Sequence, residues 1–449
     1  MSAASTLPSS EDGLLGGLYA EHLEIMAERL AGALESLGLD GLCVFAGPER
    51  LVARDDIAYP FRIEPYFKAW LPLTNSIGSV LKLVPGRRPE LRYLQADDFW
   101  QLPPASPEGF WTNAVDIRIV RSEAELLSGL VEPGRRYAAL GDAESAAHSF
   151  ISVDDAALLA RLDFLRAWKT PYEVECIAQA SRIATAGHRA AATAFRAGGS
   201  EIDLHAAFLK AAGQREAELP YGAIIALGPH AAVLHYQNLD RVRGSSDGVS
   251  FLIDAGVEYL GYASDITRTW AEDAEEFEAL IDSVEGLQQT LCRELRGGAD
   301  FVALNARTHE LLAQVLADHG IVTCSADEAL ARGLTRTFLP HGLGHLLGLQ
   351  VHDAGGRQIT PEGARREPPA EHPFLRLTRV VEPGFVLTIE PGLYFIASLL
   401  RALGPEDRRR VDWDKIGRLM PFGGIRIEDD VLVEADGIRN LTREAFAGA

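Results

Sequence analysis

Apolar residues recur every three or four positions along residues 14–37, which predicts a first helix that ends before Gly38. Shorter apolar runs bounded by turn residues follow, and they predict strands over 41–45, 79–84, 90–95 and 137–140 and a helix over 156–165. Between them, residues 55–72 are dense in proline and aromatic side chains, and we expect proline to hold this segment away from helix. The pattern predicts a small α/β domain.

The pattern changes near Thr170. Thr170 is the predicted N-cap of a long helix, Pro171 suits its first position, and Glu173 completes a capping box, so this helix is expected to run to Arg196. Ser200 and Asp203 repeat the capping arrangement for a second helix. We place the domain boundary just before the long helix, which gives an N-terminal domain over 1–165 and a C-terminal domain over 166–449.

The C-terminal part alternates strand and helix patterns. Predicted strands cover 222–227, 249–254, 257–261, 386–390 and 424–434, predicted helices cover 275–295 and 302–319, and residues 354–372 are predicted as a loop. Two halves, each with two helices and some sheet strands, would form a two-layer α+β domain.

Composition and net charge indicate a globular protein and argue against some classes of partner. A hydrophobic content of 47% with 24% charged residues is ordinary for a globular chain of 449 residues. The net charge of -21 argues against nucleic acid or an anionic membrane as the main partner. Four scattered cysteines, no basic and apolar leader and no long apolar run predict reduced thiols and a cytoplasmic protein.

Three of the twelve histidines, His341, His345 and His352, lie in one glycine-rich stretch. Neutral imidazole binds divalent metals and carries protons near pH 7. A glycine-rich connection with surface histidines would give the same local pattern. The stretch alone leaves both interpretations open, because a metal site here needs carboxylates from elsewhere in the chain.

Four carboxylates lie in or close to apolar predicted strands. Asp254 closes one predicted strand, Asp265 follows eleven positions later, Glu390 closes another, and Glu428 shares a strand face with Arg426 if side chains alternate. Burying such groups without a cation is costly.

Together with His345, these four residues can hold two divalent ions, and the oxygen-rich set favours Mn²⁺ or Co²⁺, with Zn²⁺ as a third option. Two-metal sites generate hydroxide at neutral pH, so hydrolysis becomes the leading chemistry.

The order Asp, Asp, His, Glu, Glu resembles the metal ligands of the "pita-bread" metallopeptidases, and specifically the proline dipeptidases (prolidases). The strings Leu-Ile-Asp254-Ala-Gly, Asp265-Ile-Thr-Arg-Thr, His-Gly-Leu-Gly-His345, Thr-Ile-Glu390-Pro-Gly and Ile-Arg-Ile-Glu428-Asp are similar to the family's own. In the N-terminal part, Asp-Asp-Ile-Ala-Tyr-Pro-Phe and Phe-Lys-Ala-Trp-Leu-Pro resemble the bacterial branch that includes organophosphorus acid anhydrolases. The resemblance spans nearly the whole chain.

The resemblance implies a pita-bread C-terminal catalytic domain in which a metal-bridging hydroxide attacks the scissile carbonyl of an Xaa-Pro dipeptide. Glu390 would also shuttle the proton, while His235 and His352 would hold the substrate and the tetrahedral intermediate. Arg426 would bind the proline carboxylate, and His341 would be an outer contact.

Family members are homodimers in which the N-terminal domain of one subunit helps to close the pocket of the other. Asp56 and Trp100 match positions of such closing contacts. The pocket-wall positions of the family are matched by Tyr221, Leu234, Val351 and Leu375. Phe301 departs from the pattern, because relatives can carry tyrosine there, and this leaves the substrate preference open.

Three other functions remain compatible with this sequence. The same ligands could serve phosphotriester hydrolysis, because a bridging hydroxide can attack phosphorus as well as carbon. They could also remove the N-terminal residue from longer Xaa-Pro peptides. A pita-bread domain that binds peptides without catalysis is the third alternative, and such proteins generally lack the metal ligands.

Overall fold

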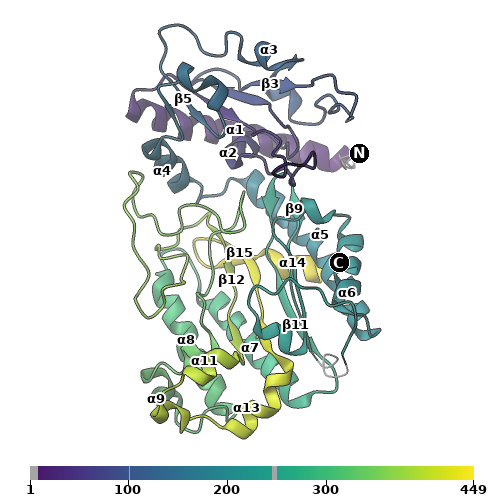
Figure 1. The fold of residues 1–449 in the computed structure, drawn as a ribbon. Coiled ribbons are helices and arrows are strands. Elements are labelled where there is room, and N and C mark those ends of the chain that lie inside the picture. The colour runs from purple at the N-terminus through teal and green to yellow at the C-terminus, as the bar shows by residue number, and fades with distance from the viewer. Residues whose placement is uncertain (1–8, 101, 245–249, 449) are drawn as a thin grey trace. The chain divides into compact units, whose positions relative to one another are not determined.

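The structure, a computed structural model, describes residues 9–100, 102–244 and 250–448. The chain divides into two compact units (Figure 1), one made of Met1–Cys176 with Thr360–Ala364, the other of Ile177–Ile359 with Arg365–Ala449. Among the described residues, no helix is both long enough and apolar enough to cross a membrane. All four cysteines are free thiols, and Cys43, Cys176 and Cys292 are buried.

The first unit is built on a mixed six-stranded sheet with the order β4-β3-β2-β1-β5-β6. Its central strand β1 pairs antiparallel with β2 and parallel with β5. In chain order the elements are α1 (Ser9–Leu37), β1 (Gly41–Phe45), α2 (Pro65–Trp70), β2 (Val80–Leu83), β3 (Glu90–Leu94), β4 (Asp116–Val120), α3 (Glu123–Leu127), β5 (Tyr137–Leu140), β6 (Ser152–Val153) and α4 (Ala156–Leu165).

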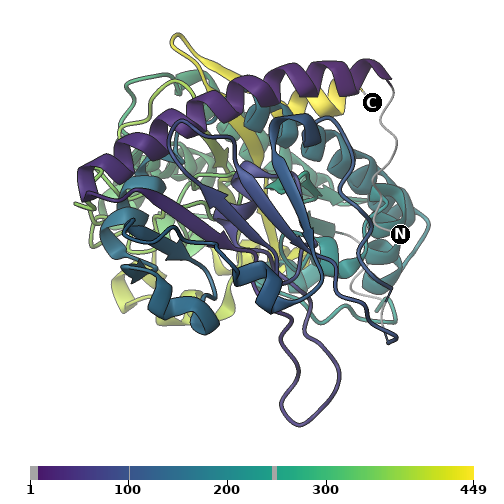
Figure 2. The same ribbon diagram turned by 90° about the horizontal axis from the view of Figure 1, so that it is seen from above.

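Alternation along β1 explains how this sheet buries both faces. Cys43 and Phe45 belong to one core cluster with Val80, Tyr137 and Phe150, whereas Leu42 and Val44 point to the opposite face and are also buried. Figure 2 shows α1 lying across the strands of this sheet. The α/β character predicted for the N-terminal part is confirmed.

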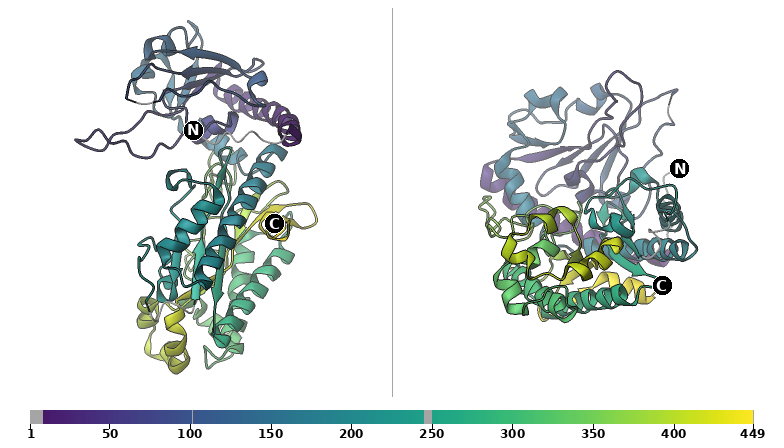
Figure 3. Two further views of the ribbon diagram at one scale, coloured as in Figure 1. Left: turned by 90° about the vertical axis from the view of Figure 1, so that its right-hand side faces the viewer. Right: turned by 60° about the horizontal axis from the view of Figure 1, so that its bottom comes forward.

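The second unit has two similar halves. One half contains α6 (Glu201–Ala212), the part of α5 (Pro171–Arg196) after Cys176, and the antiparallel sheet β11-β8-β7. The other half contains α7 (Glu275–Glu294), α8 (Phe301–Asp318) and the sheet β12-β15-β16. Figure 3 shows these long helices at the outside of the unit, with the strands between them.

The strands of these sheets are β7 (Ile224–Leu227), β8 (Ser250–Asp254), β11 (Thr267–Ala271), β12 (Val386–Ile389), β15 (Asp429–Val433) and β16 (Ile438–Asn440). Two further pairs are β9 (Glu258–Tyr259) with β10 (Tyr262–Ala263) and β13 (Gly392–Tyr394) with β14 (Gly424–Arg426). Shorter helices are α9 (Ala326–Ala331), α10 (Thr335–Phe338), α11 (Ala397–Ala402), α12 (Pro405–Arg408), α13 (Trp413–Leu419) and α14 (Leu441–Gly448).

Both predicted capping boxes are present. The Thr170 amide donates to Glu173 Oε2 at 2.8 Å, and the Glu173 amide donates to Thr170 Oγ1 at 3.3 Å. Ser200 and Asp203 form the same reciprocal arrangement at the start of α6. Local sequence therefore sets where α5 and α6 begin.

Three local predictions are wrong. Residues 65–70 form the short helix α2 inside the segment expected to avoid helix, because Pro65 occupies its first turn and Glu64 caps it. Residues 424–434 are two strands in different sheets, broken at Ile427 and Glu428. Residues 257–261 contribute only two residues to a tight hairpin, with Tyr259 opposite Tyr262.

Candidate metal centre

Asp254 and Asp265 lie side by side, as predicted for a strand, a turn and a returning strand. Asp254 is the last residue of β8 and pairs with Thr267 of β11. The hydroxyl of Tyr221 donates to Oδ1 of Asp254 at 2.8 Å and also contacts Oδ1 of Asp265. The turn between them requires Gly256, because a Cβ there would lie 1.9 Å from the Ser264 carbonyl oxygen.

Two hydrogen bonds to Thr388 hold His345 against β12. Its amide donates to Thr388 Oγ1 at 3.1 Å, and the Thr388 amide donates to the His345 carbonyl at 2.9 Å. Gly344 permits this approach, because a Cβ would lie 2.0 Å from the Thr388 carbonyl oxygen. Nδ1 of His345 lies 3.0 Å from the Leu346 carbonyl, so Nδ1 carries the proton and Nε2 is left as a ligand atom.

Nε2 of His345 faces two carboxylates, Asp265 Oδ2 at 3.4 Å and Glu390 Oε1 at 3.5 Å. One ligand atom each from Asp265, His345 and Glu428 lies within 4.8 Å of the other two, and all three residues are buried. The structure thus brings the five predicted ligand residues to one place, from strands and loops separated by up to 174 positions in sequence.

Glu428 sits at the break between β14 and β15, where it forms an isolated bridge with Thr267. Thr267 Oγ1 donates to Glu428 Oε2 at 2.5 Å and accepts from Arg426 Nε at 3.1 Å. Arg426 and Glu428 therefore share a face, as alternation predicted, although the strand itself is interrupted between them.

Burial makes this group of acids electrostatically unfavourable without cations. Burial raises the pKa of Glu390 to about 7, against the opposing effect of His345 and Arg426. Burial, then the charges of Asp265 and Glu390, raises the pKa of Glu428 well above its usual range. Burial also raises the pKa of Asp254 despite Arg426. Divalent cations would offset these penalties, so the residues fit a metal site.

For His345, burial affects the pKa less strongly than the neighbouring carboxylates do together. Burial alone would lower the pKa of its imidazole, but the carboxylates of Asp265 and Glu390 outweigh burial and raise the pKa to about 9. A strong attraction for positive charge at Nε2 is what a cation site requires.

Arg426 is 5% exposed and makes three side-chain hydrogen bonds. Besides its bond to Thr267, Nη1 donates to the Tyr394 hydroxyl at 2.9 Å and Nη2 donates to Asp254 Oδ2 at 2.5 Å. His341 Nε2 lies 2.8 Å from the same Tyr394 hydroxyl, and its Nδ1 lies 3.8 Å from Glu390 Oε2. Tyr394 thus links His341 to Arg426, and Arg426 contacts the candidate ligand Asp254 directly.

His352 lies beside the ligand His345, with ring centroids 4.4 Å apart and planes at 84°. Burial, and then the charge of His345, lowers the pKa of His352 to about 4. His235 is exposed on the turn after β7. Burial, and then the charge of Arg426, lowers the pKa of His341 to about 4. A charge on His235 would act in the same direction on His341 and His352.

The predicted wall residues differ in exposure. Leu375 is fully buried, with its main chain against Gly342, whereas Leu234 and Val351 are half-buried. Tyr221 differs from the other predicted wall residues, because its hydroxyl forms hydrogen bonds to two candidate metal ligands, Asp254 and Asp265. Phe301 is fully buried at the start of α8.

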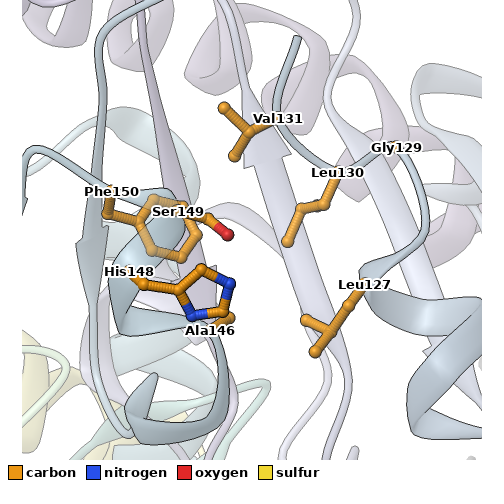
Figure 4. Close-up of a pocket in the computed structure, with 8 residues that line it drawn as sticks. All are labelled: Leu127, Gly129, Leu130, Val131, Ala146, His148, Ser149 and Phe150. Atoms are coloured by element: carbon orange, nitrogen blue, oxygen red, sulfur yellow. The ribbon is translucent and has the colours of Figure 1, made fainter. Parts of the chain in front are cut away.

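In the first unit, Asp56 and Trp100 are both exposed. Trp100 is 82% exposed and contacts Phe99, with ring centroids 4.8 Å apart and planes tilted by 38°. Asp56 lies on the loop over residues 46–64, which extends beyond the sheet of its own unit (Figures 2 and 3). A separate cavity of about 220 Å³ near His148 and Phe150 (Figure 4) is lined by described residues that include none of the predicted site residues.

Thr267 and Tyr394 belong to the centre but were not predicted as site residues from the sequence. Thr267 joins Arg426 to Glu428, and Tyr394 joins Arg426 to His341. Each stands in a strand where a threonine or tyrosine is ordinary. Their one local signal was proximity in sequence to Asp265 and Glu390.

Comparison with family models gives two matches. Residues 175–435 match the model described as Metallopeptidase family M24. Residues 17–164 match the model described as Xaa-Pro dipeptidase, N-terminal domain.

Curated relatives match over nearly the whole chain. The Xaa-Pro dipeptidase of Xanthomonas campestris pv. campestris strain 8004 is 46% identical over 435 residues, which cover 96% of this chain and 98% of the relative. The Xaa-Pro dipeptidase of Stenotrophomonas maltophilia strain R551-3 is 45% identical over 438 residues, 97% of this chain and 98% of the relative.

Solved structures share the fold. Zn-substituted Escherichia coli aminopeptidase P in complex with product superposes with a TM-score of 0.70 at 24% identity, covering 93% of this chain and 94% of that one. Pseudomonas aeruginosa aminopeptidase PepP gives a TM-score of 0.69 at 24% identity, covering 95% of each chain. Both the N-terminal α/β part and the pita-bread part are included in these matches.

Proposed function

The chain belongs to metallopeptidase family M24, and we propose that it is a dinuclear-metal Xaa-Pro dipeptidase. The observation that carries this proposal is the convergence of Asp254, Asp265, His345, Glu390 and Glu428, with His345 Nε2 at 3.4 and 3.5 Å from two of the carboxylates. Relatives that are about 45% identical over nearly their full length bear the name Xaa-Pro dipeptidase.

The five residues would hold two divalent ions, which supply a hydroxide nucleophile at neutral pH and polarise a scissile carbonyl. Four carboxylates with a single imidazole form a hard, oxygen-rich donor set. We propose Mn²⁺ as the ion, with Co²⁺ and Zn²⁺ as alternatives.

Glu390 has the position of a proton carrier as well as a ligand. One of its oxygens faces His345 and the other faces His341 at 3.8 Å. Glu390 would carry the proton between the nucleophile and the leaving group while it also binds metal. His235 and His352 would hold the substrate carbonyl and stabilise the charge that develops on its oxygen.

Arg426 would bind the carboxylate of the substrate proline. Each terminal nitrogen of its guanidinium uses one N–H group, towards Tyr394 or Asp254. A second N–H group on each nitrogen is left, and such a pair matches the two oxygens of a carboxylate. A clamp on the C-terminal carboxylate restricts the substrate to two residues.

We propose that the protein acts as a cytoplasmic homodimer, with residues 1–165 serving dimerisation and pocket closure and residues 166–449 forming the catalytic domain. Asp56 and Trp100 are exposed on their own unit, which leaves both side chains available to a second chain. Tyr221, Leu234, Val351 and Leu375 would form the walls around the substrate.

The test is a comparison of kcat/KM, with the Mn²⁺-loaded protein, for Leu-Pro, Gly-Pro, a longer Xaa-Pro peptide and a phosphotriester. We expect the dipeptides to be hydrolysed best. Faster turnover of the longer peptide would instead indicate an aminopeptidase, and faster turnover of the phosphotriester an organophosphorus hydrolase.

A further inference from the structure

Glu201, the first residue of α6, carries a buried carboxylate that is 1% exposed and accepts four hydrogen bonds. Oε1 accepts from the Leu227 amide at 2.9 Å and from His230 Nδ1 at 2.7 Å. Oε2 accepts from the Tyr236 hydroxyl at 2.7 Å and from the Asp240 amide at 2.7 Å.

All four donors belong to one segment, residues 227–240, and this segment carries Leu234 and His235. Past β7 the segment has one short 3-10 helix, Gly228–Ala232, followed by a turn and extended chain. Two of the four bonds hold its ends, at Leu227 and Asp240, and the other two hold its middle on either side of His235. The ring of His230 also stacks on Tyr236, with centroids 4.5 Å apart.

A metal ion is a poor alternative partner for this group, although Glu201, His230 and Asp240 each place one ligand atom within 4.8 Å of the others. A carboxylate has about four lone-pair sites. On Glu201 four donors occupy them, and two of these are main-chain amides that cannot turn away. The carboxylate of Glu201 therefore holds residues 227–240 against the start of α6.

We propose that Glu201 is a positioning residue, which sets the turn that presents His235 to the substrate. The inference rests on the proposed function, because it needs His235 to act on an Xaa-Pro substrate. Glu201 itself would touch neither substrate nor metal.

Glu201→Gln is the informative substitution. Each oxygen of Glu201 accepts from one main-chain amide, so the NH₂ group of the introduced side chain would face an N–H donor in either of its orientations. One buried amide would lose its acceptor, and the turn would shift to recover it. Displacement of a catalytic group by about 1 Å can reduce turnover by about a hundredfold.

The experiment is a double-mutant cycle on kcat/KM for Leu-Pro, using Glu201→Gln, His235→Ala and both together in the metal-loaded protein. Metal content by elemental analysis should stay at the wild-type level in all three, because no metal ligand changes. We expect Glu201→Gln to lower kcat/KM by about ten- to a hundredfold. In the His235→Ala background we expect Glu201→Gln to have almost no additional effect.

Glu173→Gln is the matched control, because Glu173 is likewise a buried glutamate in the first turn of a helix, 5% exposed, but its capping hydrogen bonds are to Thr170 and not to residues 227–240. Its effect should be the same with and without His235. If Glu201→Gln does not yield folded protein, Tyr236→Phe removes one of the four donors and should show a smaller loss that again vanishes with His235→Ala.

Equal fold-losses from Glu201→Gln in both backgrounds, or no loss at all, would overturn the inference while leaving the proposed function intact. If His235→Ala keeps full activity, the proposed role of His235 is wrong, and the inference falls with it.

Discussion

Nη2 of Arg426 lies 2.5 Å from Oδ2 of Asp254, so the residue proposed to bind the substrate carboxylate is paired with a candidate metal ligand. Their side chains are only 6% and 13% exposed. Burying either charge alone is costly, and the pair with its further bonds to Tyr394 and Thr267 compensates that cost. If Arg426 binds the substrate carboxylate as proposed, substrate binding and metal binding would be coupled through one guanidinium.

Arg426→Lys tests this coupling. Lysine keeps the charge that balances Asp254 but cannot reproduce three directed bonds and a planar fork. We expect metal content near that of the wild type and a fall in kcat/KM for Leu-Pro of about a hundredfold or more, since a loss of about 3 kcal/mol corresponds to roughly that factor.

Arg426→Ala is the companion variant, and unlike Arg426→Lys it should also lower the stability of the fold. Removing one partner of a buried ion pair costs about 3–5 kcal/mol, so its urea midpoint should drop while that of Arg426→Lys changes little. If both variants keep wild-type kcat/KM, Arg426 does not bind the substrate.

His345 and His352 should respond differently to alanine substitution, although their rings are 4.4 Å apart. His345→Ala removes a predicted ligand and should weaken metal binding, which elemental analysis after gel filtration would detect. His352→Ala should retain the metal and lose turnover, because its imidazole is expected to contact substrate. Equal metal loss in both variants would contradict this division of roles.

Stability should fall in mild acid because of His188. This residue is fully buried, with Nε2 2.9 Å from the Ala255 carbonyl, and burial lowers its pKa to about 3. The unfolded state takes up this proton below about pH 6.5, so the free energy of unfolding should fall as the pH drops from about 6.5 towards 3. The slope from this one group approaches about 1.4 kcal/mol per pH unit.

Urea denaturation between pH 7 and pH 4.5 measures this slope. His188→Gln can keep the donor to Ala255 but has no proton to take up, so its stability should depend less on pH. An unchanged slope in the variant would mean that other groups account for the acid sensitivity.

Some of this molecule could be predicted from sequence because the signals are local. The capping pairs at Thr170 and Ser200 fixed the starts of two helices, and acids at the ends of apolar strands marked Asp254 and Glu390. The contacts of Glu201, Thr267 and Tyr394 are made with partners 26 to 161 positions away in the sequence. A local pattern of apolar and polar residues therefore cannot predict them. The interrupted strand at Ile427 was missed because its apolar alternation continues through the break.

The most direct measurement of the central claim is a metal titration followed by hydrolysis of Leu-Pro. The chain is stripped with a chelator and titrated with Mn²⁺, with Glu428→Gln as the ligand variant. We expect activity to disappear on stripping, to return and saturate near about two ions per chain, and to return poorly in Glu428→Gln. Full activity in protein that contains no metal by elemental analysis would contradict the account.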